Sequence, residues 1–242
     1  MLIDVEGIIL NTKNYGDTSK ILDILTIDYG IIGVVAKGCK SIKSNLRSVT
    51  DKLTYAKFTI YYKKGKLSTL SEASIINNFT NIKKDIEKIS YASFLLDLTN
   101  QVYKHSEDSE VYSILISSLI KINDGFNPLV ITNIVELKYL NYLGIGLYLD
   151  GCSICGNKNV VTISSDKGGY LCSKCHTNEP IVSEKAIKLI RMYTLVDIDK
   201  ISKLEISKEA VKEVNSFIDD YYDRYSGLYL KSKSFLKNIN KM

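Results

Sequence analysis

The sequence predicts an α+β protein with a small N-terminal β barrel and a following α-helical domain, into which a four-cysteine ribbon is inserted. Three observations support this fold class. Short apolar and alternating segments separated by turn residues fill residues 5–78, a helical period begins at Ile82, and two closely spaced cysteine pairs follow near residues 152–175. We therefore place the barrel at residues 1–80, the helical domain at 81–242 and the ribbon at 150–178.

The expected barrel strands follow one another closely. Residues 19–26 and 57–62 alternate apolar and polar side chains, and the pairs Tyr29-Gly30 and Lys64-Gly65 supply turns. The strands are predicted at 7–11, 19–26, 31–36, 57–62 and 67–76. Five short strands in about 80 residues suit a small closed barrel.

Helical spacing replaces the alternation from Ile82 onward. Apolar residues then recur every three, four or seven positions up to Tyr103, which predicts one long helix. A second helix is expected at about 110–122, and a third between Pro128 and Gly144. Capping residues mark the starts of the later helices, at Asn127, Ser183 and Ser207.

The composition is that of an ordinary globular protein. Hydrophobic residues make up 45% of the 242 residues and charged residues 24%, and there are two prolines. The apolar runs are shorter than the roughly 18 residues that a membrane span needs, and the first residues carry acids where a signal peptide is basic. We expect a cytoplasmic protein with no membrane association, and five cysteines without a disulfide framework agree with a reducing compartment.

The strongest motif is a C-x2-C-x16-C-x2-C pattern, which has the spacing of a zinc ribbon. Its members are Cys152, Cys155, Cys172 and Cys175. A two-residue gap lets one turn point both sulfurs at a common ion, and Gly156 permits the tight backbone there. Because four thiolates fill a tetrahedron, we expect one structural Zn²⁺. Two alternatives stay open: merely buried cysteines, or a site in which His176 replaces Cys175.

No catalytic constellation is recognisable. His105 and His176 are the only histidines, and no H-x-E, H-E-x-x-H or G-x-x-x-x-G-K-[ST] motif is present. The acids of the first strands are scattered, as surface acids are, and a zinc hydrolase is disfavoured because no general base accompanies the cysteines. We therefore expect a protein without enzymatic activity, nucleotide site or redox cofactor.

Positive charge is concentrated in the barrel. Residues 36–66 contain nine basic and one acidic side chain, a local charge of +8, whereas the whole chain carries +5. Such a segment is typical of proteins with a polyanion partner, because phosphates can lie along the charges while bases stack on aromatic rings. The candidate rings are Tyr15, Tyr29, Tyr55, Phe58, Tyr61 and Tyr62. Alternatively, half of these rings are core and the lysines only solvate an edge strand. Cys39, within the segment, is interpreted as a free, incidental thiol.

The sequence resembles the bacterial RecO family of DNA repair proteins in a series of short segments that occur in order along almost the whole chain. The segments are Gly7-Ile-Ile-Leu10, Asn14-Tyr-Gly-Asp17, Ser19-Lys-Ile-Leu22, Tyr29-Gly30, Ala36-Lys-Gly38, Ser90-Tyr-Ala-Ser93, Glu136-Leu-Lys-Tyr-Leu140, Leu143-Gly144, both cysteine pairs, Leu230-Lys-Ser232 and Phe235-Leu236. Each segment alone is weak, but their joint order is specific.

The resemblance implies an oligonucleotide-binding (OB) barrel, a helical domain and a zinc ribbon. It also implies a nucleoid-associated protein that binds single- and double-stranded DNA, anneals complementary strands and, with RecR, helps RecA to replace the single-strand-binding protein SSB. The helical domain would receive the acidic C-terminal tail of SSB. The expected DNA contacts are Lys13, Lys37, Lys40, Lys43, Arg47, Lys63, Lys64 and Lys66.

Two points qualify these expectations. Family members often carry paired arginines after the Lys-Gly, whereas this chain has Cys39-Lys-Ser-Ile-Lys43, so a bidentate grip on phosphate would be weaker. An RNA-binding protein of translation or ribosome assembly is the alternative function, because OB folds and zinc ribbons occur there too. Basic residues near the C-terminus could extend the DNA track or form a solvated tail: Lys231, Lys233, Lys237 and Lys241.

Overall fold

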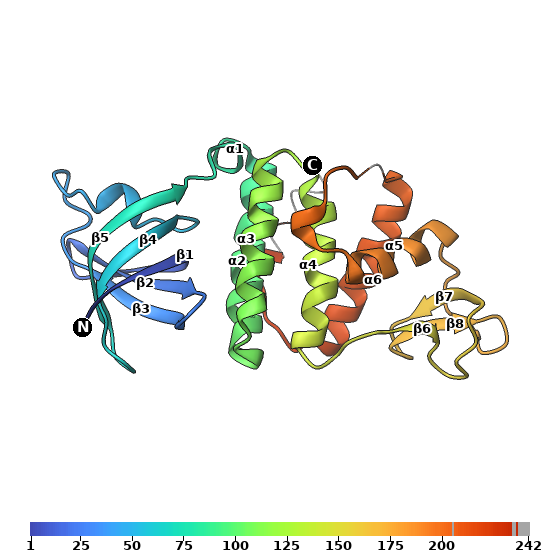
Figure 1. Ribbon diagram of the computed structural model, residues 1–242. Coiled ribbons are helices and arrows are strands. Elements are labelled where there is room, and N and C mark those ends of the chain that lie inside the picture. The colour runs from blue at the N-terminus through green and yellow to red at the C-terminus, as the bar shows by residue number, and fades with distance from the viewer. Residues whose placement is uncertain (205, 234–235, 237–242) are drawn as a thin grey trace. The chain divides into compact units, whose positions relative to one another are not determined.

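The computed structural model describes residues 1–204, 206–233 and 236 (Figure 1). Two compact units divide the chain: Met1–Asp124 together with the segment that begins at Leu230, and Gly125–Tyr229. Each helix within the described ranges is too short or too polar to span a bilayer. The first unit holds the barrel and the second holds the cysteine ribbon, and each unit also contains α-helices.

A closed five-stranded barrel forms the N-terminal part, as the sequence predicts. Its strands are β1 (Leu2–Tyr15), β2 (Ser19–Thr26), β3 (Gly30–Ala36), β4 (Tyr55–Tyr61) and β5 (Ser68–Asn77). The order around the barrel is β1-β2-β3-β5-β4, in which all neighbours are antiparallel except β3 and β5. This five-stranded closure is OB-like, which confirms the predicted fold class.

The first strand is longer than predicted. β1 pairs with β4 through its first half and with β2 from Gly7 onward, and the register shifts between Ile9 and Asn11. The acids that obscured its start have partners on β4. Asp4 lies 2.9 Å from the Lys57 ammonium and accepts a hydrogen bond from the Thr59 hydroxyl at 2.7 Å. Acidic residues have a low propensity for strands, and these exposed cross-strand pairs explain why β1 nevertheless begins with them.

Inward-facing side chains of all five strands build the barrel core, which includes Leu22, Ile24, Ile32, Val34 and Phe58. Cys39 belongs to the same core and is 1% exposed. Cys39 is a free thiol, as predicted, but it is buried in the barrel core. The chain turns inward directly after Gly38, whose positive φ of 63° allows that turn.

Helices α1 (Thr80–Lys83), α2 (Ile86–Ser106) and α3 (Ser109–Asn123) complete the first unit. The long helix expected from Ile82 is interrupted, because the Asp85 carboxylate accepts hydrogen bonds from the backbone N–H groups of Glu87 and Lys88 and starts α2 anew. Near the middle of α2, Asp97 accepts a hydrogen bond from Ser232 at 2.7 Å, which ties the C-terminal segment to this helix. Phe235, Lys237 and Lys241 lie outside the described residues.

One carboxylate links the barrel to the helices of its own unit. Oε1 of Glu6 on β1 accepts hydrogen bonds from the hydroxyls of Tyr55 on β4 and Tyr112 on α3, the latter at 3.2 Å. Both tyrosines are buried. Burial, followed by the hydrogen bond to Glu6, raises the pKa of Tyr55 to about 12, so the phenol remains a donor well above neutral pH.

We expect Glu6→Ala to lower the free energy of unfolding by about 1–2 kcal/mol, because two buried hydroxyls lose their acceptor. Glu6→Gln keeps an acceptor and should cost less. Folding raises the pKa of Tyr55. The stabilisation that the protonated Tyr55 hydroxyl contributes is therefore complete below pH 10 and is lost as the pH rises towards about 12. Urea unfolding of both variants checks this; equal destabilisation by Ala and Gln would contradict it.

In the second unit, helices α4 (Pro128–Tyr142), α5 (Glu184–Leu195) and α6 (Lys208–Tyr225) pack together. The hydroxyl of Tyr222 donates to the carbonyl of Glu136 at 2.8 Å, and the Lys138 ammonium donates to the carbonyl of Thr194 at 3.2 Å. The predicted caps are confirmed, because their side chains accept hydrogen bonds from first-turn backbone N–H groups. They are Asn127, Ser183 and Ser207.

Candidate metal centre and nucleic-acid interface

The cysteine ribbon is a three-stranded sheet of β6 (Tyr148–Cys152), β7 (Val160–Ser164) and β8 (Gly169–Cys172) in the order β6-β8-β7. β6 was not predicted from the sequence. β7 and β8 form an antiparallel hairpin, and β6 lies parallel to β8. The ends of β6 and β8 carry Cys152 and Cys172, so this pairing brings the two cysteine pairs together.

All four predicted ligands lie in one cluster. The Sγ atoms of Cys152, Cys155, Cys172 and Cys175 lie within 4.8 Å of one another, and those of Cys155 and Cys172 are 3.6 Å apart. A tetrahedral ion with metal–sulfur distances of about 2.3 Å would place its sulfurs about 3.8 Å apart. The cluster therefore fits one metal ion held by sulfur alone.

Tight turns position the sulfurs in each pair. After the first pair, Gly156 has a φ of +74° and its N–H donates to the carbonyl of Cys152 at 2.8 Å. A Cβ on Gly151 would lie 2.8 Å from the Gly156 carbonyl oxygen, so the backbones approach too closely for another residue. In the second pair, the N–H groups of Cys175 and His176 both donate to the carbonyl of Cys172.

The thiol pKa values diverge within this cluster. Burial alone would raise the pKa of Cys152, but hydrogen bonds from nearby backbone N–H groups outweigh it and lower that pKa to about 6. The thiol of Cys175 lies against the sulfur of Cys155 and is also desolvated, which raises its pKa to about 12. A cation among the four sulfurs would stabilise their thiolate forms.

The imidazole of His176 is engaged elsewhere. Its Nε2 lies 2.7 Å from the carbonyl oxygen of Glu179, and the metal-ligand cluster of the described residues contains the four cysteines without it. Four sulfurs also complete a tetrahedron and leave no open coordination position, which is typical of a structural site rather than a catalytic one. The arrangement thus favours Cys175 over His176 as the fourth ligand.

The eight basic residues expected to contact DNA are all exposed. Within the described ranges, none of them forms an ion pair with an acid. Other bases of the same segment have partners: Lys57 pairs with Asp4, and Lys52 is half-buried, which lowers its pKa despite the nearby charge of Asp97. Fewer positive charges are therefore available to a polyanion than the number of basic residues in the segment suggests.

The available bases form two groups at opposite ends of β3. Lys13 and the connection that carries Lys37–Arg47 lie by the β1–β2 turn, where the N–H of Lys40 donates to the carbonyl of Thr18 at 2.9 Å. The second group lies in the β4–β5 hairpin, which is next to the β2–β3 turn because β5 runs parallel to β3. A seven-residue strand separates the groups by about 20 Å.

Between the two groups, the outer face of β2 and β3 presents apolar side chains, a glycine and one acid, Asp23, which lies opposite Gly33. Ile21, Ile31 and Gly33 are half-buried there. A Cβ on Gly33 would lie 2.8 Å from the side chain of Leu67, so glycine allows the hairpin to approach the sheet. In OB folds, this face and its flanking loops are where oligonucleotides bind.

Of the six candidate stacking rings, Tyr55 and Phe58 are core residues, with exposures of 9% and 0%. The expectation that they are available to bases is wrong: Phe58 points into the barrel core, whereas Tyr55, on the opposite face of β4, is buried against Phe79 and donates to Glu6. Tyr15 and Tyr61 are more than half exposed, and the Tyr29 and Tyr62 rings lie 5.0 Å apart at the base of the basic hairpin. The sequence did not indicate that Leu2 belongs to this surface. Leu2 on β1 pairs with Tyr61 on β4, and only the closure of the barrel brings the two residues together.

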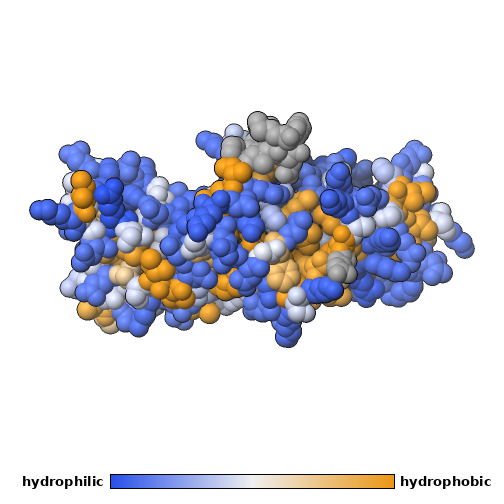
Figure 2. Space-filling view, turned by 90° about the horizontal axis from the view of Figure 1, so that it is seen from above, coloured by the Kyte–Doolittle hydropathy of each residue, from blue (hydrophilic) through white to orange (hydrophobic). Residues whose placement is uncertain are grey.

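Exposed apolar side chains form small local patches and not one continuous surface. Figure 2 shows hydrophilic side chains over most of the face in view, with hydrophobic side chains in separate patches. The exposed large apolar residues at the hairpin end of the barrel are Leu2, Ile27, Tyr29, Tyr61 and Leu67. They share this end with Lys63, Lys64 and Lys66, so aromatic and basic groups lie close together.

Comparison with known proteins gives a consistent result. The family profile "Recombination protein O N terminal" matches residues 1–79, and "Recombination protein O C terminal" matches residues 83–234. Proteins named DNA repair protein RecO are similar over nearly their full length. That of Listeria monocytogenes serotype 4b (strain CLIP80459) is 33% identical over 241 residues, or 98% of this chain and 94% of the relative.

Other curated relatives extend this match. The DNA repair protein RecO of Bacillus pumilus is 33% identical over 247 residues, covering 100% of this chain and 96% of the relative. That of Halalkalibacterium halodurans is 32% identical, covering 100% and 97%. An OB-like barrel, a helical unit and a four-cysteine cluster occur in the order that the sequence motifs predict, and on these matches the chain belongs to the RecO family of DNA repair and recombination proteins.

Proposed function

We propose that the protein binds single- and double-stranded DNA through its barrel and anneals complementary strands, without catalytic turnover. With RecR, it would help RecA to load on SSB-coated DNA in the cytoplasm, at the nucleoid. Family membership supports the role in repair and recombination. The observation that carries the DNA-binding part is the set of eight exposed bases without acidic partners, on both sides of the outer face of β2 and β3.

This arrangement suits annealing. Phosphates can follow the bases from the β1–β2 end to the β4–β5 hairpin, and counterion release supplies affinity that does not depend on sequence. Such contacts hold the backbone and leave base edges available for pairing with a second strand. The acidic C-terminal tail of SSB is proposed to bind the helical domain, as the family resemblance implies.

Binding to matched single-stranded DNA, duplex DNA and RNA tests this function. If six phosphates are contacted, log K should fall with log salt with a slope of about −4 for single strands. DNA should bind at least as tightly as the matched RNA. A flat salt dependence would reject the electrostatic interface, and a clear preference for RNA would favour the alternative role in translation or ribosome assembly.

Tyr61 is the exposed ring best placed to stack with a base. It is 52% exposed and immediately precedes the basic hairpin. Tyr61→Ala should weaken single-stranded DNA binding by about 1–3 kcal/mol while leaving the salt slope unchanged, since no charge is lost. Tyr148→Ala, on the ribbon and similarly exposed, is the control. Fluorescence anisotropy measures both, and an effect no larger than that of the control would exclude stacking at Tyr61.

We also propose that the ion held by the four cysteines is Zn²⁺. Four thiolate ligands with C-x2-C spacing and no open position are the usual donor set of structural zinc. Its role would be to fold the ribbon, because its three short strands bury few apolar residues around the cysteines. The residues that bind the ion, Cys152 and Cys172 above all, also end the strands, so metal binding and strand pairing support each other.

A further inference from the structure

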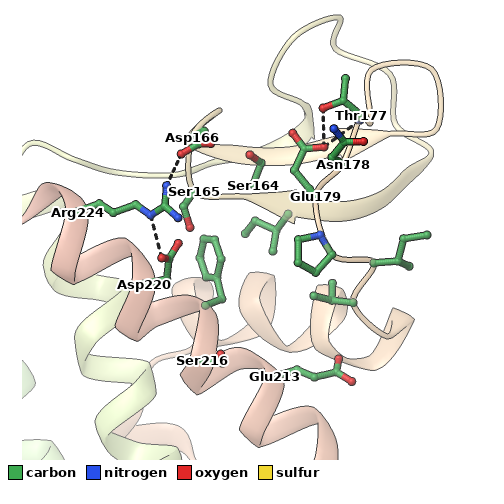
Figure 3. A pocket seen from close by; sticks show the side chains of 15 residues that line it. Ser164, Ser165, Asp166, Thr177, Asn178, Glu179, Glu213, Ser216, Asp220 and Arg224 are labelled. Carbon is green, nitrogen blue, oxygen red and sulfur yellow. Dashed lines mark hydrogen bonds and ion pairs between the residues drawn. The ribbon is translucent and has the colours of Figure 1, made fainter.

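A cavity of 690 Å³ opens in the unit Gly125–Tyr229, between the ribbon and α6 (Figure 3). β7 and the turn after it supply one wall, residues 177–182 supply another, and α6 supplies the third. This volume lies within the range of about 300–1,000 Å³ that is typical of binding pockets. Neither the metal centre nor the DNA-binding barrel uses it.

The pocket has an apolar floor. Ile163 of β7 is 4% exposed, and Phe217 of α6 is half-buried beside it. At the rim, Ile181, which directly follows Pro180, is 73% exposed. A ligand that covered this rim would remove an isolated large apolar side chain from water, which favours association.

Charge around the floor is predominantly negative. Four carboxylates line the pocket against one guanidinium, which gives a net charge of −3. Arg224 donates to Asp220 at 2.8 Å and to Asp166 at 2.6 Å. In Figure 3 these three residues lie together at one end of the pocket. Because the guanidinium of Arg224 is shared by two carboxylates there, it does not neutralise the other two acids of the pocket, Glu179 and Glu213.

Glu179, in the segment after the ribbon, and Glu213, on α6, line the pocket from opposite sides (Figure 3). Glu179 accepts a hydrogen bond from the N–H of Thr177, and Glu213 accepts one from the N–H of Ser183. The Thr177 N–H holds the pKa of Glu179 below its usual range, so this carboxylate is charged at neutral pH. No lysine or arginine in the described part of the chain pairs with either carboxylate.

We propose that this pocket binds a basic segment of a partner polypeptide in which a lysine or arginine is next to an apolar residue. The aliphatic stem of the basic side chain would lie on Ile163 and Phe217, and its charged end would be attracted by the acidic side chains that line the pocket, Glu179 and Glu213 among them. The apolar neighbour would cover Ile181. Because the same carboxylates repel phosphates and acidic peptides, this site is independent of the proposed DNA-binding face.

Selection of peptides from a displayed random library on the full-length, zinc-loaded protein tests the proposal. Recovered peptides should be enriched in lysine or arginine flanked by apolar residues. The double variant Glu179→Gln, Glu213→Gln should lose this enrichment, and a recovered peptide should bind it about tenfold more weakly by fluorescence anisotropy. The variant Glu184→Gln, Glu209→Gln carries the same charge change outside the pocket and should retain binding.

Zinc content, thermal unfolding and DNA affinity should be unchanged in the double variant, which separates loss of the pocket from loss of the fold or of DNA binding. Recovery of peptides without basic residues, or of the same peptides by the double variant, would overturn the proposal. Absence of any enrichment on the wild-type protein would overturn it as well.

Discussion

Replacing Cys172 with serine is expected to release the metal ion and unfold the ribbon. The sulfur of Cys172 is buried in the cluster, and the residue also ends β8, the central strand of the three. Structural zinc contributes about 10–16 kcal/mol to the folding of zinc-finger peptides, far more than three short strands gain by pairing alone. The effect should therefore be the largest of any single substitution considered.

Hydrogen exchange and metal analysis check this expectation together. Exchange should accelerate throughout residues 150–178 in Cys172→Ser or after chelation, while the barrel strands stay protected. Cys39→Ala removes a buried cysteine outside the cluster and should retain one metal ion per chain. If Cys172→Ser kept its metal and the protection of the ribbon, the structural role of the cluster would be wrong.

The second large effect is expected from Lys37, Lys40 and Lys43, which all lie in the exposed connection after β3. Changing all three to glutamate replaces attraction to phosphate with repulsion and should abolish DNA binding. Changing them to glutamine should make the salt slope shallower by about 2 for single strands, because three phosphate contacts are lost. Salt titration by anisotropy gives both results.

Three exposed lysines of the other unit supply a control with the same change in charge: Lys185, Lys208 and Lys212. Their replacement by glutamate should leave the salt slope unchanged and lower affinity only through weak long-range repulsion. Equal losses in the two triple variants would mean that net charge, and not the barrel surface, governs binding.

Local signals predicted most of the fold. Alternation revealed β2 to β5, and cap residues such as Asn127 marked helix starts, because both depend on neighbours in sequence. The exceptions involve partners far along the chain. Asp4 and Glu6 concealed the first half of β1, since their partners lie on β4 and α3. The start of α2 was misplaced because Asp85 caps it within an apparently continuous period.

The same distinction between local signals and distant partners applies to the candidate sites. Cys152 and Cys172 could be identified from spacing alone, because metal geometry constrains the sequence directly. The proposed DNA-binding surface could be outlined but not divided into its two groups, because the parallel pairing of Val34 with Ser68 decides where the β4–β5 hairpin lies. The acidic pocket gave no signal in the sequence, since Glu179 and Glu213 line one cavity only because the ribbon packs on α6.

Annealing of complementary strands that are both coated with SSB tests the central proposal most directly. The wild-type protein should accelerate duplex formation. The glutamate triple variant at Lys37, Lys40 and Lys43 should not, while the triple variant at Lys185, Lys208 and Lys212 should behave like the wild type. Annealing by the barrel variant at the wild-type rate, or none by the wild-type protein, would contradict the proposal that these lysines pair DNA strands.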